Sequence, residues 1–338
     1  MSAPTVAAGR PATPGLSQLM ARIGLLPVLI VIMILLMSIA EPRFYGSGNV
    51  VNIVRTTALL AVVASGQALV LIIGGFDLSV GAIIALASVI TAKAMGIAAA
   101  LMPGEVVAIS MIGIVAGLAC GGLVGLVNGL CVAVLKVPGF IVTLGTMSAT
   151  MGLALMLTSG IPVYGMPAEF VKSFGRGLWF GIPVTVYVAL AIVALMIFVQ
   201  RRTLLGRYLY AIGGNTHAAV VSGISTRPYV IVTYVISGVL AAVTSLLLTA
   251  QIGSGQASLG GDRMMLQTIA AAVIGGVSLR GGVGRLERVL ISALFLTILT
   301  NSLNLLRVDS KIQLIILGLI MVAAVAIDEV SLRRRNRG

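Results

Sequence analysis

Long apolar runs separated by short polar joints dominate the chain from residue 23 to residue 327. Each run approaches the roughly 20 residues that a helix needs to cross the hydrocarbon core of a bilayer. We therefore predict an all-α integral membrane protein with about ten transmembrane helices. The predicted spans are 23–40, 50–73, 78–100, 105–135, 139–158, 183–199, 228–250, 265–279, 289–306 and 311–327.

The composition agrees with this prediction. Apolar residues make up 59% of the 338 residues and charged residues only 9%, whereas a soluble domain carries about 25% charged residues. A water-soluble fold is therefore excluded. The two cysteines, Cys120 and Cys131, fall on one predicted helix about 16 Å apart along its axis, so they cannot form a disulfide with each other.

The formal net charge of +13 is explained by membrane orientation and requires no nucleic-acid partner. If both termini are cytoplasmic, the inner segments hold fourteen of the 22 basic residues, as the positive-inside rule requires. The first apolar run is longer than the core of a secretory signal, so we expect it to be retained. We predict a disordered cytoplasmic lead at 1–22, one transmembrane domain at 23–328 and a basic cytoplasmic tail at 329–338.

Two joints are long, and the first, 159–182, falls on the outer side of this topology. Phe170, Phe174 and Leu178 follow one another at four-residue spacing, which predicts a short amphipathic helix at the membrane interface. Lys172, Arg176 and Trp179 lie beside them. The segment is either an aromatic anchor or a docking ledge for an extracellular receptor.

The second long joint, 200–227, falls on the inner side. A short run at 215–222 is bounded by glycines, with Asn215 placed to cap a helix and Gly223 placed to end it. Such a helix is either a knob that enters a pocket on another protein or part of a solvated loop. The single histidine, His217, lies in this run, and the chain offers no set of ligands for a metal.

Glycines are regularly spaced in the fourth predicted span. They recur at every fourth position, which forms a groove where another helix can approach closely. The row serves either helix packing or a moving seam between helices. Its members are Gly113, Gly117, Gly121, Gly125 and Gly129.

Two segments, 73–81 and 274–282, are predicted to interrupt helices. They share the pattern Ile-Gly-Gly-x-x-Leu at a separation of 201 residues, which suggests internal duplication. Asp77 is interpreted as the N-cap of the third span, with gating as the alternative. The gate or broken-helix candidates are Gly74, Gly75, Asp77, Ser79, Gly275 and Gly276.

The spans contain neutral polar residues but almost no charge. These residues serve either hydrogen bonding between helices or brief contact with a hydroxylated solute. The pathway candidates are Gln67, Asn128, Thr143, Asn301 and Asn304. No phosphate-binding loop occurs, and no nucleophile or acid–base constellation appears, so we expect neither enzymatic activity nor a bound cofactor.

Several segments resemble one known family. They read Gly-Gly-Phe-Asp-Leu-Ser-Val-Gly at 74–81, Val-Pro-Gly-Phe-Ile-Val-Thr-Leu-Gly at 137–145, Gly-Arg-Tyr-Leu-Tyr-Ala-Ile-Gly-Gly-Asn at 206–215 and Ala-Ala-Ala-Val-Ile-Gly-Gly-Val-Ser-Leu at 270–279. From about residue 50 to residue 328, the chain is similar to the permeases of ribose, xylose and galactose ABC importers. Two segments depart from the family pattern: 264–268 reads Met-Met-Leu-Gln-Thr, and 285–289 reads Arg-Leu-Glu-Arg-Val.

The resemblance implies a ten-helix permease of the bacterial inner membrane that forms a homo- or heterodimer. It also implies a separate cytoplasmic ATPase, which binds ATP and Mg²⁺, and a periplasmic sugar-binding protein. The implied coupling residues are Gly206, Arg207, Gly213, Gly214, Asn215, Ala218, Ala219, Gly223 and Ile224. We expect inward transport of a pentose or hexose by alternating access. A polyol, a furanose sugar or a sugar-like signal is the near alternative, and an ion-coupled secondary transporter is the alternative from another class.

Overall fold

The computed structural model describes residues 25–335, without the side chains of residues 25, 324 and 327–335. The predicted lead at 1–22 and the last three residues of the predicted tail lie outside the described residues. Residues 329–335 of that tail continue the last helix, so the helix extends beyond the predicted end of its span at residue 327.

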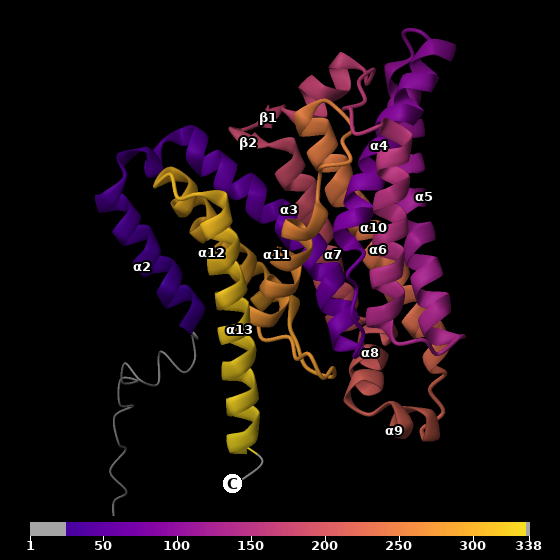
Figure 1. Ribbon diagram of the computed structural model, residues 1–338, viewed down its shortest axis with the longest axis vertical. Helices are drawn as coiled ribbons and strands as arrows, with labels where there is room; N and C mark the ends of the chain where they lie inside the picture. The colour runs from indigo at the N-terminus through magenta and orange to yellow at the C-terminus, as the bar shows by residue number, and fades with distance from the viewer. Residues whose placement is uncertain (1–24, 336–338) are drawn as a thin grey trace, which may run out of the picture.

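The predicted spans correspond to ten helices in chain order. They are α2 (Leu25–Ala40), α3 (Ser47–Ile72), α4 (Val80–Leu101), α5 (Val106–Ala133), α6 (Gly139–Thr158), α7 (Val184–Arg202), α10 (Thr226–Ile252), α11 (Gly261–Ile274), α12 (Leu286–Leu305) and α13 (Ser310–Arg335). Two further α-helices, α8 (Leu204–Gly214) and α9 (Thr216–Val221), lie together at one end of the bundle, at the bottom of Figure 1. We call this end the α9 end.

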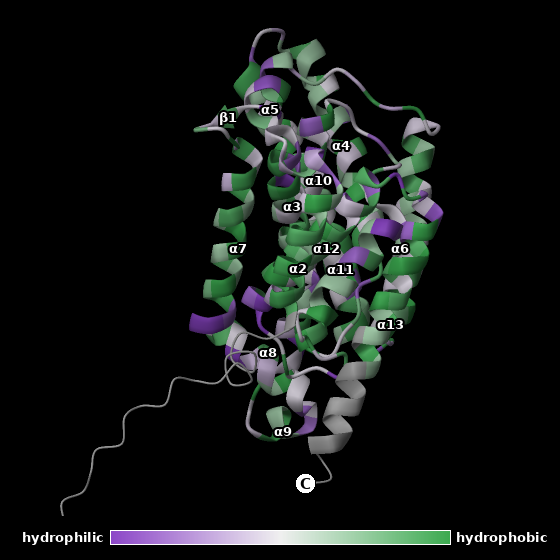
Figure 2. Ribbon diagram, turned by 90° about the vertical axis from the view of Figure 1, so that its left-hand side faces the viewer, coloured by the Kyte–Doolittle hydropathy of each residue, from purple (hydrophilic) through white to green (hydrophobic). Residues whose placement is uncertain are grey.

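Among the described residues, seven of these helices are long and apolar enough to cross a membrane: α3, α4, α5, α6, α7, α10 and α12. Shorter apolar stretches occupy α2, at Leu26–Ala40, and α13, at Ser310–Ala323. Hydrophobic residues run along the helices in Figure 2, and hydrophilic residues appear on α7 close to α8. The protein therefore has the all-α architecture of a multi-pass membrane protein.

Helices α3, α4 and α10 form the centre of the bundle. Their apolar windows are 78%, 72% and 61% buried, whereas those of α5 and α6 are only 28% and 22% buried. The packing of α3 and α4 against α10 therefore forms the core. In Figure 1, α5 and α6 lie on one side of this core, and α2, α12 and α13 lie on the other.

The predicted glycine row does form a packing groove, which lets α5 approach its neighbours closely. A methyl group at Gly121 would lie 2.3 Å from the carbonyl oxygen of Gly238, and one at Gly125 would lie 2.3 Å from that of Tyr234, both on α10. Glycine is required at these positions because any side chain would separate the two backbones. Cys120 and Cys131 lie on the same helix as free thiols and, as predicted, do not pair with each other.

The eighth span differs most from its prediction. Its helix, α11, covers 261–274 instead of 265–279, and an extended segment precedes it. That segment passes along α4, since a methyl group at Gly255 would lie 2.5 Å from Ala92 Cβ and one at Gly260 would lie 2.4 Å from the Gly81 carbonyl oxygen. Helices α4 and α11 therefore begin beside each other. Gly260 can make this turn because it has a φ of +81°.

The backbone of the extended segment finds hydrogen-bond partners within the protein. Gly255 pairs with Val163 through two bonds of 2.8 Å, and the Gln256 amide donates to Ser88 Oγ at 3.1 Å. Non-helical backbone is tolerated at membrane depth only where protein or water satisfies its polar groups. These bonds explain how the eighth span can be part extended and part helical.

The predicted amphipathic helix of 159–182 is only partly correct. A single π-helical turn, η2 (Phe170–Gly175), stacks Phe170 on Phe174 with ring centroids 5.3 Å apart. Leu178 does not continue this helix. It belongs instead to a two-residue strand, β1 (Leu178–Trp179), which pairs antiparallel with β2 (Ile182–Pro183). The helix ends where Gly175 packs tightly on α10, since a methyl group at Gly175 would lie 2.0 Å from the Ala250 carbonyl oxygen.

Candidate functional site

Residues 214–224, which we call the α9 segment, contain the capped helix that the sequence predicts. Asn215 is the N-cap of α9, and its Oδ1 accepts a hydrogen bond from the Ala218 amide at 2.9 Å. At the other end the Ile224 amide donates to the Ala219 carbonyl at 3.0 Å, and the Gly223 amide donates to Val220. This is the Schellman pattern, with Gly223 at a φ of +82°. The short helix is therefore fixed at both ends.

Helix α8 attaches this segment to the bundle. Thr203 Oγ1 caps α8 by accepting from the Gly206 amide at 3.4 Å, and Leu209 and Ile212 are buried. Gly206 must be glycine, because a methyl group there would lie 2.0 Å from the Gln200 carbonyl oxygen. A displacement of α8 would therefore also displace the helices that pack around it.

In contrast to α8, helix α9 is largely exposed. Val220 and Val221 are 53% and 74% exposed, and Ala218 and His217 are also exposed. Ala219 alone in this helix is buried. Two exposed valines on a capped two-turn helix form an apolar projection at the α9 end that the described part of the chain leaves uncovered.

Three glycine segments meet where α8 ends. A methyl group at Gly213 would lie 1.8 Å from the Ile72 carbonyl oxygen and 2.7 Å from the Gly282 amide nitrogen. The Gly282 amide in turn donates to the Ile72 carbonyl at 2.8 Å, and a methyl group at Gly281 would lie 3.0 Å from Gly74 Cα. The end of α8 is thus packed, backbone to backbone, between the two predicted helix interruptions. We call this contact the glycine junction.

The two interruptions end their helices in the same way. After α3, Gly74 has a φ of +84°, and the Gly75 amide donates to the Val70 carbonyl at 2.8 Å. After α11, Gly276 has a φ of +81°, and the Val277 amide donates to the Ala272 carbonyl at 3.0 Å. Both are Schellman caps. In the first segment, the left-handed residue is Gly74, the first glycine of the shared Ile-Gly-Gly pattern. In the second segment, it is Gly276, the second glycine of the pattern, because Gly275 is the C-cap of α11.

The prediction that Asp77 is the N-cap of the third span, α4, is wrong, because Ser79 occupies that position. The Asp77 carboxylate instead accepts hydrogen bonds from Ser79 N at 3.0 Å and from Ser79 Oγ at 2.6 Å. Its other oxygen accepts from Ser237 Oγ on α10 at 2.7 Å. Asp77 and Ser79 are both fully buried. The carboxylate therefore joins the interruption after α3 to the central helix α10.

The same network extends to α5 and α6. Asn128 Nδ2 donates to Ser79 Oγ at 2.9 Å, and Asn128 Oδ1 accepts from Thr146 Oγ1 at 2.7 Å. Tyr234 donates its hydroxyl to the Phe76 carbonyl at 3.0 Å. Asn128, a predicted pathway candidate, thus links α5 to α6 and to the segment before α4. We call the set Asp77, Ser79, Asn128, Thr146 and Ser237 the carboxylate network.

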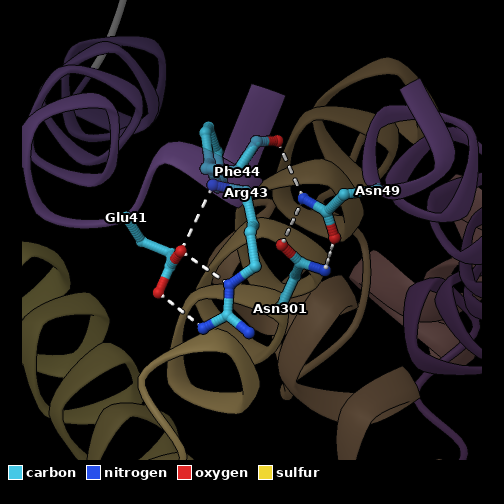
Figure 3. A network of polar contacts seen from close by, with 5 residues as sticks. All are labelled: Glu41, Arg43, Phe44, Asn49 and Asn301. Carbon is cyan, nitrogen blue, oxygen red and sulfur yellow. Dashed lines mark hydrogen bonds and ion pairs between the residues drawn. The ribbon is translucent and has the colours of Figure 1, made fainter. Parts of the chain in front are cut away.

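Another pathway candidate, Asn301, also joins helices. Asn301 on α12 and Asn49 on α3 exchange amide hydrogen bonds of 2.7 and 3.1 Å (Figure 3). Beside them the Arg43 guanidinium binds Glu41 and holds the pKa of its carboxyl at about 2. The Arg43–Glu41 ion pair and the hydrogen bond from Asn49 to the Phe44 carbonyl, at 2.9 Å, order the turn between α2 and α3.

The remaining pathway candidates differ in their surroundings. Asn304 accepts from Gln313 Nε2 at 2.8 Å, and Gln313 accepts from Arg263 at 2.7 Å, which links α12, α13 and α11. Thr143 donates to the Gly139 carbonyl in its own helix at 2.8 Å. Gln67 is fully buried on α3, and neither amide atom has a hydrogen-bond partner among the described residues.

Sequence reasoning missed four residues that carry these links: Asn49, Thr146, Tyr234 and Ser237. Ser, Thr and Tyr are common in apolar helices, so their presence there is no signal on its own. Ser237 is separated from Asp77 by 160 residues, and nothing in the local pattern connects them. No cluster of three metal-ligating side chains occurs within the part of the chain that the structure describes.

The sequence matches a known protein family over most of its length. The family described as the permease component of branched-chain amino acid transport systems matches residues 49–325. The ribose import permease protein of Haemophilus influenzae is 36% identical over 304 residues, covering 89% of this chain and 91% of the relative. The ribose import permease protein of Bacillus subtilis is 38% identical over 301 residues, covering 88% and 89%.

A third relative is named for a different sugar. The L-arabinose transport system permease protein of Escherichia coli strain K12 is 35% identical over 303 residues, covering 89% of this chain and 88% of the relative. No solved structure matches the chain.

Proposed function

Because the chain belongs to the family of transport-system permeases that includes these ribose and arabinose permeases, we propose that it is the membrane subunit of an ATP-driven sugar importer. The solute is a monosaccharide, a pentose or a hexose, and a polyol, a furanose sugar or a sugar-like signal is the near alternative. The proposal rests on one observation about α8 and α9: α8 packs firmly against the bundle, whereas α9, which follows it, is largely exposed.

The proposed topology has ten membrane crossings, with both termini in the cytoplasm. Seven long helices, the shorter α2 and α13, and the extended segment with α11 supply the ten. The α9 end is cytoplasmic because the arginines of the joints gather there, as the positive-inside rule requires. These are Arg201, Arg202, Arg207, Arg227, Arg280, Arg285 and Arg288.

The chain itself binds no nucleotide in this proposal. A separate cytoplasmic ATPase binds ATP and Mg²⁺ and receives α9, and a periplasmic sugar-binding protein delivers the solute at the opposite end. A second copy or a paralogue of the chain completes the transport path. Val220 and Val221 of α9 are the apolar contacts that we assign to the ATPase, since exposed apolar patches mark sites of protein association.

The mechanism is alternating access. Movement of the ATPase pulls α9, and α8 passes the movement to the glycine junction at Ile72, Gly213 and Gly282. That junction is backbone against backbone, so it has no flexible side chain to absorb a displacement. The carboxylate network then links the end of α3 to α10, α5 and α6. The helices can respond to ATP only if the ATPase binds one of their two arrangements more tightly.

The test replaces exposed residues on the α9 segment with tryptophan and measures association with the ATPase. Gly214→Trp is suitable because a Cβ at Gly214 meets nothing within 4 Å, and Gly48→Trp, equally open on α3 at the opposite end, is the control. We expect Gly214→Trp and Ala218→Trp to abolish association while Gly48→Trp retains it. Full association and uptake by both α9-segment variants would refute the proposed contact.

A further inference from the structure

A basic cavity at the α9 end borders the glycine junction at Gly282 but has no assigned role in the transport mechanism above. Its volume is about 720 Å³, and it lies between the α7–α8 corner and the start of α12. Four of its lining residues are arginines: Arg201, Arg207, Arg285 and Arg288. Arg285 is the N-cap residue of α12, and Arg288 lies in the first turn of that helix. The four arginines therefore concentrate positive charge at this position.

The positive charge of the cavity is largely uncompensated. Arg201 forms an ion pair with Glu287. The side chains of Arg207, Arg285 and Arg288 have neither an ion pair nor a hydrogen bond with any residue that the structure describes. The cavity also lies at the N-terminus of α12, a 20-residue helix, whose dipole adds a partial positive charge. Guanidinium groups in this arrangement suit phosphate oxygens, which they can bind through two parallel bonds.

A buried amide provides an independent sign of a ligand. Gln200 lines the cavity and is only 4% exposed. Its Oε1 accepts from the Leu286 amide at 3.1 Å, which fixes the side chain, but its Nε2 has no partner among the described residues. A buried donor without an acceptor is unfavourable. An anion in the cavity would balance the arginines, and it would offer Gln200 Nε2 an acceptor once the covered amide tilts toward the cavity.

The position of the cavity indicates the source of the anion. Leu195 and Phe198 on α7 are 54% and 57% exposed, and Arg201 follows Phe198 by three residues, so it continues the same helix face. An apolar face that ends in arginine at the α9 end matches a phospholipid, with acyl chains along α7 and a headgroup at Arg201. We propose that this cavity binds the phosphate of an anionic phospholipid headgroup in the leaflet at the α9 end.

The test measures lipid retention by the purified full-length chain with native mass spectrometry. The probes are phosphatidylglycerol and phosphatidylcholine, each added separately in detergent. We expect the chain to retain phosphatidylglycerol preferentially, and Arg285→Gln with Arg288→Gln to lower that retention by about tenfold. The control is Arg202→Gln with Arg227→Gln, which removes the same charge from two arginines outside the cavity and should retain the lipid.

A further variant and a second probe sharpen the result. Gln200→Glu keeps the acceptor for Leu286 but replaces the free donor with a carboxylate, so it should also lower retention. Equal losses in the cavity pair and in the control pair would overturn the proposal, because general surface charge would then explain binding. Thermal protection by millimolar inorganic phosphate, without lipid selectivity, would overturn the lipid source. Loss of ATPase association in the cavity pair, with lipid retention intact, would reassign the arginines to the ATPase and also overturn it.

Discussion

Replacing Gly213 with alanine tests whether the glycine junction is a rigid link. The added methyl group would lie 1.8 Å from the Ile72 carbonyl oxygen and 2.7 Å from the Gly282 amide nitrogen. Both neighbours are backbone atoms, so they cannot rotate away. The end of α8 must therefore move by about 1.5 Å before ordinary van der Waals contact is restored.

The size of the effect follows from three contributions. Overpacking costs about 1–3 kcal/mol. Separation of the segments also weakens the bond from the Gly282 amide to the Ile72 carbonyl, 2.8 Å long, which costs about 1 kcal/mol. Alanine is favoured over glycine in a helix by up to about 1 kcal/mol. Gly214→Ala has the same helical gain without a clash, because its Cβ meets nothing within 4 Å.

We therefore expect Gly213→Ala to be less stable than Gly214→Ala by about 2–4 kcal/mol. The assay is unfolding of the purified chain in detergent, followed by ATP-driven sugar uptake after reconstitution with the ATPase. Uptake should fall in Gly213→Ala and remain in Gly48→Ala, whose Cβ also meets nothing within 4 Å. A Gly213→Ala variant as stable as Gly214→Ala, with uptake equal to that of Gly48→Ala, would refute the rigid junction.

Three further predictions concern the links between helices. Asp77→Asn should destabilise the purified chain by about 2 kcal/mol, because charge-assisted hydrogen bonds are lost. Ser237→Ala removes a single hydrogen bond and should cost about 1 kcal/mol. The free energies of unfolding check both values, and an Asp77→Asn variant as stable as the parent chain would contradict the carboxylate network. Alanine at Asn49 and Asn301, singly and together, should give a coupling energy of about 1–2 kcal/mol in a double-mutant cycle, whereas additive effects would contradict the reciprocal amide pair. Gly223→Ala should cost about 1–2 kcal/mol from its left-handed backbone, measured against Gly214→Ala; a stability equal to that of the control would contradict the Schellman cap.

Hydropathy was sufficient to predict the seven long helices, because their apolar runs are long enough to cross a membrane, whereas the eighth span was predicted with the wrong bounds. The fifth span was predicted at 139–158, and α6 covers the same residues. The α9 cap was also predictable, since Asn215 and Gly223 act on neighbouring backbone groups. Local chemistry and hydrophobic length are both readable from one sequence.

Features that depend on distant contacts were not predictable in this way. The extended segment before α11 depends on the approach of Gly260 to Gly81, which lies far away along the chain. Leu178 matched a helical spacing, but the packing of Gly175 on Ala250 ended the helix first. The partners of Asp77 required the position of α10. In each case tertiary packing decided between local conformations that the sequence left open.

In the proposed mechanism, energy for transport reaches this chain from a separate ATPase through α9. The most direct measurement is sugar accumulation in proteoliposomes that contain the purified chain, with and without the ATPase and with an ionophore that dissipates ion gradients. If the ATPase supplies the energy, accumulation requires both ATP and the ATPase and persists with the ionophore. Accumulation by the chain alone, abolished by the ionophore, would contradict this mechanism.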